Sequence, residues 1–425
     1  MSRGAATLPP HWERLLTQAE SAEGPLGDLR RTGAGRLRTL AFPGPREEAW
    51  RFTSLRALER LEPEFPSPPA QPAAQDLHRV SLCAALTPRL AFFGGRHAPA
   101  GSAVEALPEG LTLAPLASVS DRPEPLATQG DPRTRAFADA LAQDGALVRV
   151  APKAVISAPV HLVFWTARRP QQVAVAPRIV VDVARGAEIS LVVEIVGDSE
   201  AVYLNAASVD LRIGENASVR YTEVQRESDL AFHLNGFAAV LERNARLETH
   251  HVALGGRLAR TDMEITLAGD GAACDLSGLY LTGGKQHMDF HTFVDHAAPH
   301  TVSREKFKGV LDGKSTAVFN GRVRVREDAQ KIDSVQANNN LLLSRHATVN
   351  TNPELEIFAD DVKAAHGATV GQIEEEQLFY LRSRGISREA ARRILIKGFA
   401  GEMIERLRVE ALRDRLMDRI GQRFS

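Results

Sequence analysis

The segment EIFADDVKAAHGATVG, residues 356–371, brings two acids, a lysine and a histidine into seven positions: Asp360, Asp361, Lys363 and His366. Two carboxylates can serve as acid and base in glycoside hydrolysis if they face one cavity about 5–10 Å apart. Neighbours on a strand point to opposite faces, so this pair cannot act together if the segment is extended. The sequence Ala-Ala-His-Gly is typical of a corner, so we expect His366 to project from the end of the solenoid.

A second group of candidate ligands is the run HMDFHTFVDHAAPH, with His287, His291, His296 and His300. The segment alternates like a strand, in which residues four apart lie about 13 Å apart. The two nitrogens that bind one zinc ion must be much closer, about 3–4 Å. His287 and His291 therefore cannot share a metal, and His296 faces the other side. We interpret these histidines as structural.

The run QKIDSVQANNNLLLS contains three consecutive asparagines, Asn338, Asn339 and Asn340. Stacked asparagines can form side-chain amide ladders between equivalent strands, and we interpret them as structural. The chain has no GxxxxGK[ST] phosphate loop, no GxGxxG after a strand and no GxSxG element. The motifs therefore do not indicate a nucleotide-dependent enzyme.

Composition sets further limits. The chain has 425 residues, 44% of them apolar and 25% charged, and a net charge of −1, so no overall basic field indicates nucleic acid or an anionic membrane as partner. Its two cysteines, Cys83 and Cys274, are too few for a self-contained thiolate metal or cluster site. The first twenty residues lack the apolar core of a signal peptide, and we expect a cytoplasmic protein.

The predicted secondary structure that positions these residues changes along the chain from helix to strand and back to helix. Residues 1–62 predict a helical region, with apolar residues at helical spacing around Trp12 and again in REEAWRFTSLRALERL. A proline-rich linker follows at 63–76, and 77–146 is a mixed α/β segment. In that segment RLAFFGGRH predicts a strand and turn, and RTRAFADALAQDG predicts a helix that ends at Gly145.

Residues 147–371 alternate apolar and polar side chains as strands do. Their turns repeat one chemistry, Gly or Asn before Ala. The four instances begin at residues 186, 216, 244 and 271, with spacings of 30, 28 and 27 residues. Gly and Asn tolerate the left-handed backbone of tight corners, and a regular repeat indicates stacked coils. A β-solenoid is therefore predicted, and a β-sandwich is the alternative.

Residues 372–425 return to helical periodicity. IEEEQLFYLRSRG predicts a helix that stops at Gly385. A second helix begins at the N-cap Ser387, with an apolar stripe from Ile394 through Phe399 and Met403, and VEALRDRLMDRIGQRF predicts a third. The predicted architecture is a β-solenoid between helical ends.

Residues 319–386, from FNGRVRVREDAQKID to LFYLRSRGI, resemble the C-terminal signature of the SufB/SufD family, the scaffold subunits of SUF iron–sulfur cluster assembly. GPREEAWRFTSL at 44–55 and PRIVVDVARGAEISLVVE support the resemblance. The wording LEIFADDVK…HGATVG…LFYLRSRGI and the scarcity of cysteine resemble the SufD branch. The resemblance implies a right-handed parallel β-helix with helical termini, in agreement with the repeat.

The resemblance also implies a function: a non-enzymatic scaffold that pairs with SufB and docks the ATPase SufC through its C-terminal helices. Gly385, Phe399 and Met403 are the expected docking contacts. His366 matches the family's functional histidine at the SufB–SufD interface, where it is a candidate metal ligand shared with the partner chain. The resemblance implies an iron–sulfur cluster held mainly by SufB, and no cofactor bound tightly to the isolated chain.

This sequence departs from many relatives at one position, because Ala364 stands where they have a cysteine two residues before the histidine. Direct ligation of iron by His366, the cluster type, flavin binding and homodimerisation without SufB are therefore left open. Two other functions also remain: a β-solenoid carbohydrate-active enzyme, and a structural solenoid that associates with itself.

Overall fold

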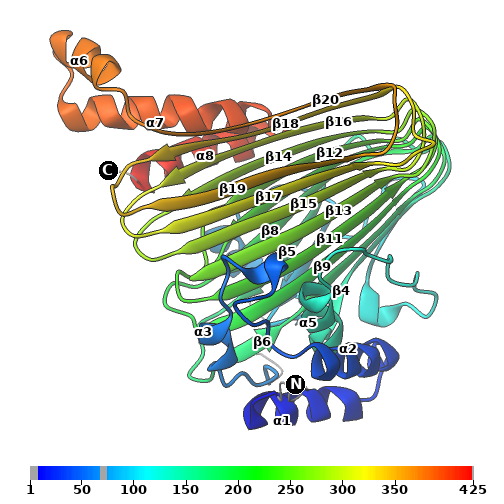
Figure 1. Cartoon of the computed structure of the whole chain (residues 1–425). Coiled ribbons are helices and arrows are strands. Elements are labelled where there is room, and N and C mark those ends of the chain that lie inside the picture. Colours follow the sequence, from blue (N-terminus) through cyan, green and yellow to red (C-terminus); the bar gives the residue numbers. More distant parts are fainter. Residues whose placement is uncertain (1–7, 68–73, 424–425) are drawn as a thin grey trace, which may run out of the picture.

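The computed structural model describes residues 8–67 and 74–423. A solenoid of two facing ten-stranded sheets forms its centre (Figure 1). In spatial order, sheet B contains β2 (Arg96–His97), β1 (Arg89–Phe93), β5 (Val160–Thr166), β8 (Glu188–Gly197), β10 (Ser218–Arg226), β12 (Arg246–Ala253), β14 (Ala273–Thr282), β16 (Val302–Leu311), β18 (Ile332–Leu342) and β20 (Val362–Gln372). Sheet A contains β3 (Leu111–Pro115), β4 (Asp144–Val150), β7 (Pro177–Val183), β9 (Tyr203–Ile213), β11 (Phe232–Leu241), β13 (Leu258–Leu267), β15 (His287–His296), β17 (Thr316–Val325) and β19 (Thr348–Ile357), and β6 (Val173–Val175) pairs with β9.

The strands of successive coils pair in parallel, as in β10 with β12 and β17 with β19. Among the described strands, antiparallel pairing joins only β1 to β2 and β3 to β4, at the start of the solenoid. The predicted parallel solenoid is confirmed. The alternative of a β-sandwich is wrong, because the repeat region is built of parallel ladders.

The predicted corners have the backbone that their residue types favour. Their first residues all have positive φ, between 57° and 71°: Gly186, Asn216, Asn244 and Gly271. The alanine that follows each one is buried where coils stack. The next two corners of the series are formed by His300 and Lys331, also at positive φ, although neither residue type marks such a corner.

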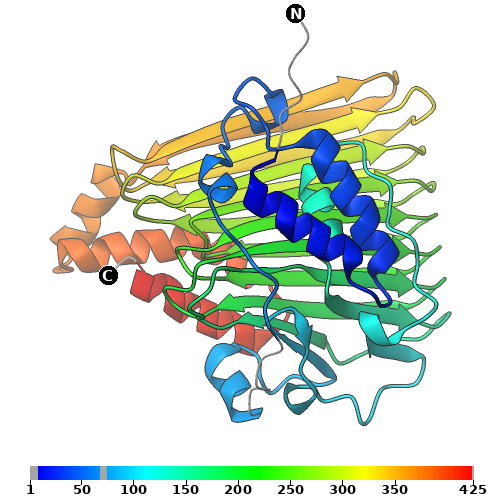
Figure 2. The same cartoon turned by 90° about the horizontal axis from the view of Figure 1, so that it is seen from below.

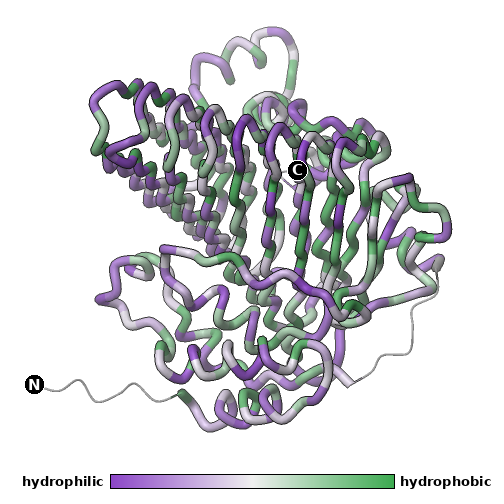
Figure 3. The backbone as a smooth tube through the Cα atoms, turned by 90° about the vertical axis from the view of Figure 1, so that its right-hand side faces the viewer, coloured by the Kyte–Doolittle hydropathy of each residue, from purple (hydrophilic) through white to green (hydrophobic). Residues whose placement is uncertain are grey.

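One face of each sheet is turned inward and the other is covered by helices. The inward side chains form one apolar core that runs along the solenoid. Hydrophobic and hydrophilic residues alternate along the strands (Figure 3). Helices α1 (Pro10–Ser21), α2 (Gly27–Leu40) and α5 (Arg133–Leu141) pack on the outer face of sheet A. Helices α7 (Arg388–Glu405) and α8 (Glu410–Arg423) pack on the outer face of sheet B (Figure 2).

The N-terminal region differs from the prediction in its helices. The segment predicted as the second helix contains only a 3₁₀ turn, Glu48–Trp50, and the short α3 (Arg56–Glu59). Its apolar residues Trp50, Leu55, Leu58 and Leu61 are nevertheless buried. The long second helix is α2, which was not predicted. Residues 68–73 of the predicted linker lie outside the described residues, and α4 (Ala74–Val80) follows them.

Two predictions for the mixed segment, residues 77–146, can be compared with the structure. RLAFFGGRH forms β1, a Gly-Gly turn and β2, as predicted. Helix α5 ends at Leu141, and Gly145 already belongs to β4, so the prediction that Gly145 stops the helix is wrong. The remaining 3₁₀ turns are Pro99–Gly101 and Leu116–Ser118.

The C-terminal helices follow the sequence closely. Helix α6 (Glu375–Ser383) ends before Gly385, which has φ +83°, and Ser387 caps α7 by accepting a hydrogen bond from the N–H of Ala390 at 3.2 Å. The buried stripe of α7 includes Met403, but Ile394 is exposed. In the described residues, no helix combines the length and the apolar character needed to cross a membrane.

Candidate functional site

His366 lies in the middle of β20, the last strand of sheet B. The prediction that Ala-Ala-His-Gly forms a corner is therefore wrong, because these residues continue the ladder with β18. In that ladder His366 is paired with Gln336, whose side chain faces the core. His366 thus points toward the interior side of the solenoid but is exposed, since no further coil covers it. Among the described residues it has no hydrogen-bond or ion-pair partner.

Behind His366, polar side chains line up across two coils of the core. Gln336 of β18 is paired with Glu305 of β16 and donates to its carboxylate at 3.1 Å. Thr292 of β15 donates to the same carboxylate from the opposite sheet at 2.6 Å. Gly321 of β17 makes room, because a Cβ there would lie 2.2 Å from the amide nitrogen of Gln336. We call His366, Gln336 and Glu305 the mouth column.

The carboxyl group at the inner end of the mouth column has an altered pKa. Burial raises the pKa of Glu305 to about 7, although Thr292 and Gln336 both donate to it. The Oε1 atom of Gln336 is buried without a partner. His366 is next to Gln336 in register, but no hydrogen bond joins its ring to this oxygen.

At this end of the solenoid, which we call the mouth, the two sheets end with the long strands β19 and β20, whose outer edges are unpaired. The N–H of Ile332 donates to the carbonyl of Asp361, so the odd-numbered residues of β20 bond to β18. The backbone groups of Ala364, His366 and Ala368 therefore point to the open edge. Such an edge is a template for another strand.

Exposed apolar residues concentrate in the part of the sequence that includes this edge. Of ten large apolar side chains that are strongly exposed in the described residues, seven fall between residues 335 and 394: Val335, Ile357, Phe358, Val370, Phe379, Tyr380 and Ile394. Val370 on β20 is 50% exposed. A concentration of this kind is typical of a surface that another protein covers.

The other residues of the opening segment do not join His366. Asp360 and Asp361 lie in the turn before β20 rather than on a strand, and both are exposed without side-chain partners in the described chain. Lys363 lies on β20 with its side chain on the outer face. The segment thus contains no pair of carboxylates around one cavity and no complete catalytic centre of its own.

The histidine run is structural, as predicted. His287 and His291 lie on the outer face of β15 on either side of Asp289; His287 contacts Thr53 at 2.8 Å and His291 contacts Asp289 at 3.0 Å. His296 faces the core, where it contacts Thr301 and Ser303. Burial lowers the pKa of His296 to about 4, so its ring is neutral near pH 7.

The asparagine run is structural too, but it forms no ladder. Asn338 and Asn340 are buried and hold the hydroxyl of Tyr280 at 3.0 and 2.6 Å, whereas Asn339 faces outward. The residues paired with Asn338 in the two neighbouring strands are Phe307 and Ala368, so no asparagine is stacked on it.

The three residues expected to dock an ATPase have different surroundings. Met403 is 3% exposed and packs α7 on the solenoid. Phe399 is partly buried under the ammonium group of Lys308, 4.4 Å from its ring centroid. Gly385 forms the exposed α6–α7 turn. Docking at these residues stays a prediction; the apolar side chains that α6 offers to a partner are Phe379 and Tyr380, 71% and 58% exposed.

Metal ligands are scarce in the chain. Within residues 8–67 and 74–423, no three His, Cys, Asp or Glu side chains come together in a way that could hold a metal ion. Cys83 and Cys274 are buried, and burial raises the pKa of both thiols, that of Cys83 to about 12. A metal at His366 would therefore need most of its ligands from another chain.

Comparison with known proteins adds a family. A family model described as "SUF system FeS cluster assembly, SufBD core domain" matches residues 164–399, from β5 into α7. A Synechocystis protein described as an iron–sulfur cluster assembly SufBD family protein is 31% identical over 406 residues, 92% of this chain and 89% of its own.

Two further relatives match a shorter part. The iron–sulfur cluster assembly protein SufD of Escherichia coli is 36% identical over 243 residues, 57% of each chain. SufD of Bacillus subtilis is 31% identical over 205 residues, 48% of this chain and 47% of its own. The chain thus matches about half the length of these two proteins. The matched part of the family model includes His366 and both edge strands.

Proposed function

This chain belongs to the SufB/SufD family of SUF iron–sulfur cluster assembly proteins, and on that premise we propose that it is a SufD-type scaffold without catalytic activity of its own. It pairs with a SufB-type chain along the open edge of its solenoid. The observation that carries this proposal is the coincidence of two unpaired edge strands with an exposed, inward-facing histidine.

The edge supports pairing with a chain of the same fold. A second solenoid end that adds strands to β19 and β20 would satisfy their free backbone groups and cover Val370 and Ile357. His366 would then lie in a closed space between the two chains. Burying an imidazole between two protein ends removes competing water and fixes the nitrogen that a partner or metal can use.

In this proposal the cluster is cargo, held mainly by thiolates of the partner. His366 supplies one nitrogen ligand or one hydrogen bond at the shared site, and the unpartnered side-chain oxygen of Gln336 is next to it in register. Ala364 leaves β20 without a thiolate beside it. The mouth column therefore positions and protonates groups at the shared site, and it does not bind a cluster without the partner chain.

The ATPase contact is assigned to the α6–α7 end of the tail. Phe379 and Tyr380 project from α6, and α7 is fixed to the solenoid by Glu402, which pairs with Lys306 and Lys308. Nucleotide-driven motion of an ATPase bound here would be passed through α7 to the strands beside the mouth. A cytoplasmic location and the absence of a resident cofactor remain part of the proposal.

The test is the amount of iron and acid-labile sulfide in the chain purified anaerobically, alone and together with its SufB-type and SufC-type partners. We expect both only in the complex. His366→Ala should lower them by about tenfold or more, the usual cost of disturbing a metal site's ligands or their hydrogen bonds. His346→Ala is the matched control, because His346 is an exposed histidine in the β18–β19 turn.

Each contrary outcome removes a different part of the proposal. A cluster on the isolated chain would contradict the need for a partner. Equal iron in wild type and His366→Ala would leave the chain as an architectural subunit only. Failure to associate with a SufB-type chain, with two copies of this chain associating through the edge instead, would favour the self-associating solenoid.

A further inference from the structure

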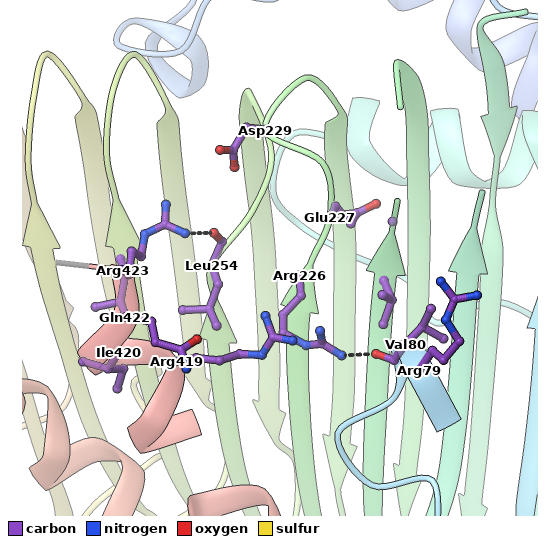
Figure 4. Close-up of a pocket in the computed structure, with 13 residues that line it drawn as sticks. Arg79, Val80, Arg226, Glu227, Asp229, Leu254, Arg419, Ile420, Gln422 and Arg423 are labelled. Carbon is purple, nitrogen blue, oxygen red and sulfur yellow. Dashed lines mark hydrogen bonds between the residues drawn. The ribbon is translucent and has the colours of Figure 1, made fainter. Parts of the chain in front are cut away.

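A cavity of about 460 Å³ lies far from the mouth, where the end of α8 meets α4 and the outer face of sheet B (Figure 4). Four arginines from three parts of the chain line it: Arg79 of α4, Arg226 of β10, and Arg419 and Arg423 of α8. Its other walls include the apolar side chains of Val196, Leu254, Leu281 and Ile420. We call it the α4–α8 cavity.

The acids at the cavity do not balance these arginines. Glu227 accepts hydrogen bonds from Asn205 and Gln225, both at 3.0 Å, and lies 2.7 Å from Nδ1 of His233. All of these contacts are inside the solenoid. In Figure 4 Glu227 points away from Arg419 and Arg423.

Asp229 is the second acid. It accepts a hydrogen bond from Gln286 at 3.0 Å, and its charge acts on Arg423. Arg423 itself donates to the carbonyl of Leu254 at 2.6 Å. One arginine of the four is thereby accounted for.

Arg226 is only partly satisfied. It donates to Glu194 at 2.8 Å and to the carbonyl of Val80 at 2.7 Å, but its Nε is buried without a partner. Arg79 has one acid nearby, Asp76 at 3.9 Å, and its side chain is 83% exposed. Arg419 makes no hydrogen bond and no ion pair within the part of the chain that the structure describes.

Arg419 is also held among like charges. Burial and the neighbouring guanidinium groups of Arg226 and Arg415 lower its pKa, while Glu194 acts in the opposite direction. Concentrating positive charge in this way costs free energy, which an anion would offset. The C-terminal end of a helix favours a cation, which helps to keep Arg419 and Arg423 there in the free chain.

We propose that the α4–α8 cavity binds a small organic oxyanion, a phosphate monoester or a carboxylate. The charged group lies beside Arg419 and Arg226, because guanidinium groups bind these oxyanions by charge-assisted hydrogen bonds. Arg79 lines the same cavity on the far side of Arg226 (Figure 4). The body of the ligand packs on Leu254 and Ile420. The cavity is larger than an inorganic ion needs, and its apolar wall favours an organic ligand.

The test is calorimetric titration of the full-length chain at constant ionic strength. Adenosine monophosphate probes for a phosphate monoester, citrate for a carboxylate, inorganic phosphate for the bare ion, and chloride for charge alone. Arg419→Gln should weaken the bound probe about tenfold, the loss expected for one charge-assisted hydrogen bond. Arg79→Gln should weaken it less, because Arg79 is more exposed.

Arg413→Gln is the matched control, since it removes the same charge from α8 outside the cavity. Saturable binding of the monophosphate or of citrate that depends on Arg419 but not on Arg413 supports the proposal, and the better probe identifies the ligand class. Absence of binding by both organic probes, or equal losses in the Arg419 and Arg413 variants, would overturn it. The proposal is independent of the pairing at the mouth.

Discussion

The two ends of the solenoid are finished in different ways. At the first end the sheets stop at short antiparallel strands, β2 with two residues and β3 with five. At the other end they stop at β19 and β20, with ten and eleven residues, parallel to their neighbours and unpaired outside. Short antiparallel strands remove a template for further pairing, whereas long parallel edges present one. In our proposal, this difference marks the end that another chain covers.

The same contrast appears in two buried glutamates. Near the first end, Glu194 of β8 lies 3.0 Å from His161 and 2.8 Å from Arg226, and it accepts the N–H of Leu82 at 2.8 Å. Burial alone would raise its pKa, but His161 and Arg226 outweigh burial and lower the pKa to about 2. Glu305 near the mouth has only neutral partners, and its pKa is raised to about 7. The region near the first end is thus stabilised by a charged carboxylate, Glu194, whereas the mouth contains a buried carboxyl group, Glu305, that titrates near neutral pH.

The largest effect on stability is expected from removing the buried charge of Glu194. Glu194→Gln leaves Arg226 buried without its counter-charge and should lower the free energy of unfolding by about 3–5 kcal/mol at pH 7. Glu305→Gln is the matched variant, because its partners are neutral; it should change stability by about 1 kcal/mol or less. Urea unfolding of both variants measures the difference. Similar losses in the two would contradict the contrast between the ends.

A change of pH should have a smaller effect on stability, with opposite signs for Glu305 and Glu194. The folded-state pKa of Glu305 is raised, so its contribution to stability is complete below pH 4.5 and is lost as the pH rises through about 7. Relative to Glu305→Gln, wild type should lose about 2–3 kcal/mol between pH 5 and pH 8. The contribution of Glu194 is instead present above pH 4.5 and is lost as the pH falls toward 2.

Urea unfolding at several pH values separates the two glutamates. The stability difference between wild type and Glu305→Gln should change in the neutral range, and that between wild type and Glu194→Gln in the acid range. A flat difference for Glu305→Gln from pH 5 to pH 8 would mean that the carboxyl near the mouth does not titrate there.

The sequence predicted the regular part of the fold because corner chemistry is local. A left-handed corner favours Gly or Asn, and four such corners set the rhythm. His300 and Lys331 form equivalent corners that residue type could not mark. Helix α2 lies within the predicted helical region 1–62 but was not singled out there, and it contains three glycines. In the fold Gly33 lets α2 approach α5, since a Cβ there would lie 2.3 Å from the backbone of Ala140.

The site was predicted less completely. The resemblance picked out His366, but its direction depends on the register between β18 and β20, which a local pattern of small residues does not contain. Glu305 and Gln336 were not predicted. They lie 31 residues apart, and Gln336 lies 30 before His366, so the coil repeat itself was the signal that could have aligned them. The role of the C-terminal docking residues stays a prediction.

The smallest of these effects tests the open edge alone. Ala368→Pro removes an N–H that points away from β18, so no bond within the chain is lost, and proline is tolerated on an edge strand. The stability of the isolated chain should therefore change little. Its affinity for a SufB-type partner should fall about tenfold or more, because an added strand loses one hydrogen bond and meets the proline ring.

Ala368→Val separates the loss of this N–H from the added bulk, because valine is also larger than alanine but keeps the N–H and favours a strand. Affinity measured by calorimetry or by co-elution should fall for proline and stay near wild type for valine. Equal affinities for all three chains would mean that the partner does not extend sheet B at β20. The apolar side chains Val370 and Ile357 would then have to account for association without strand pairing, and the open edge would not explain why this end differs from the other.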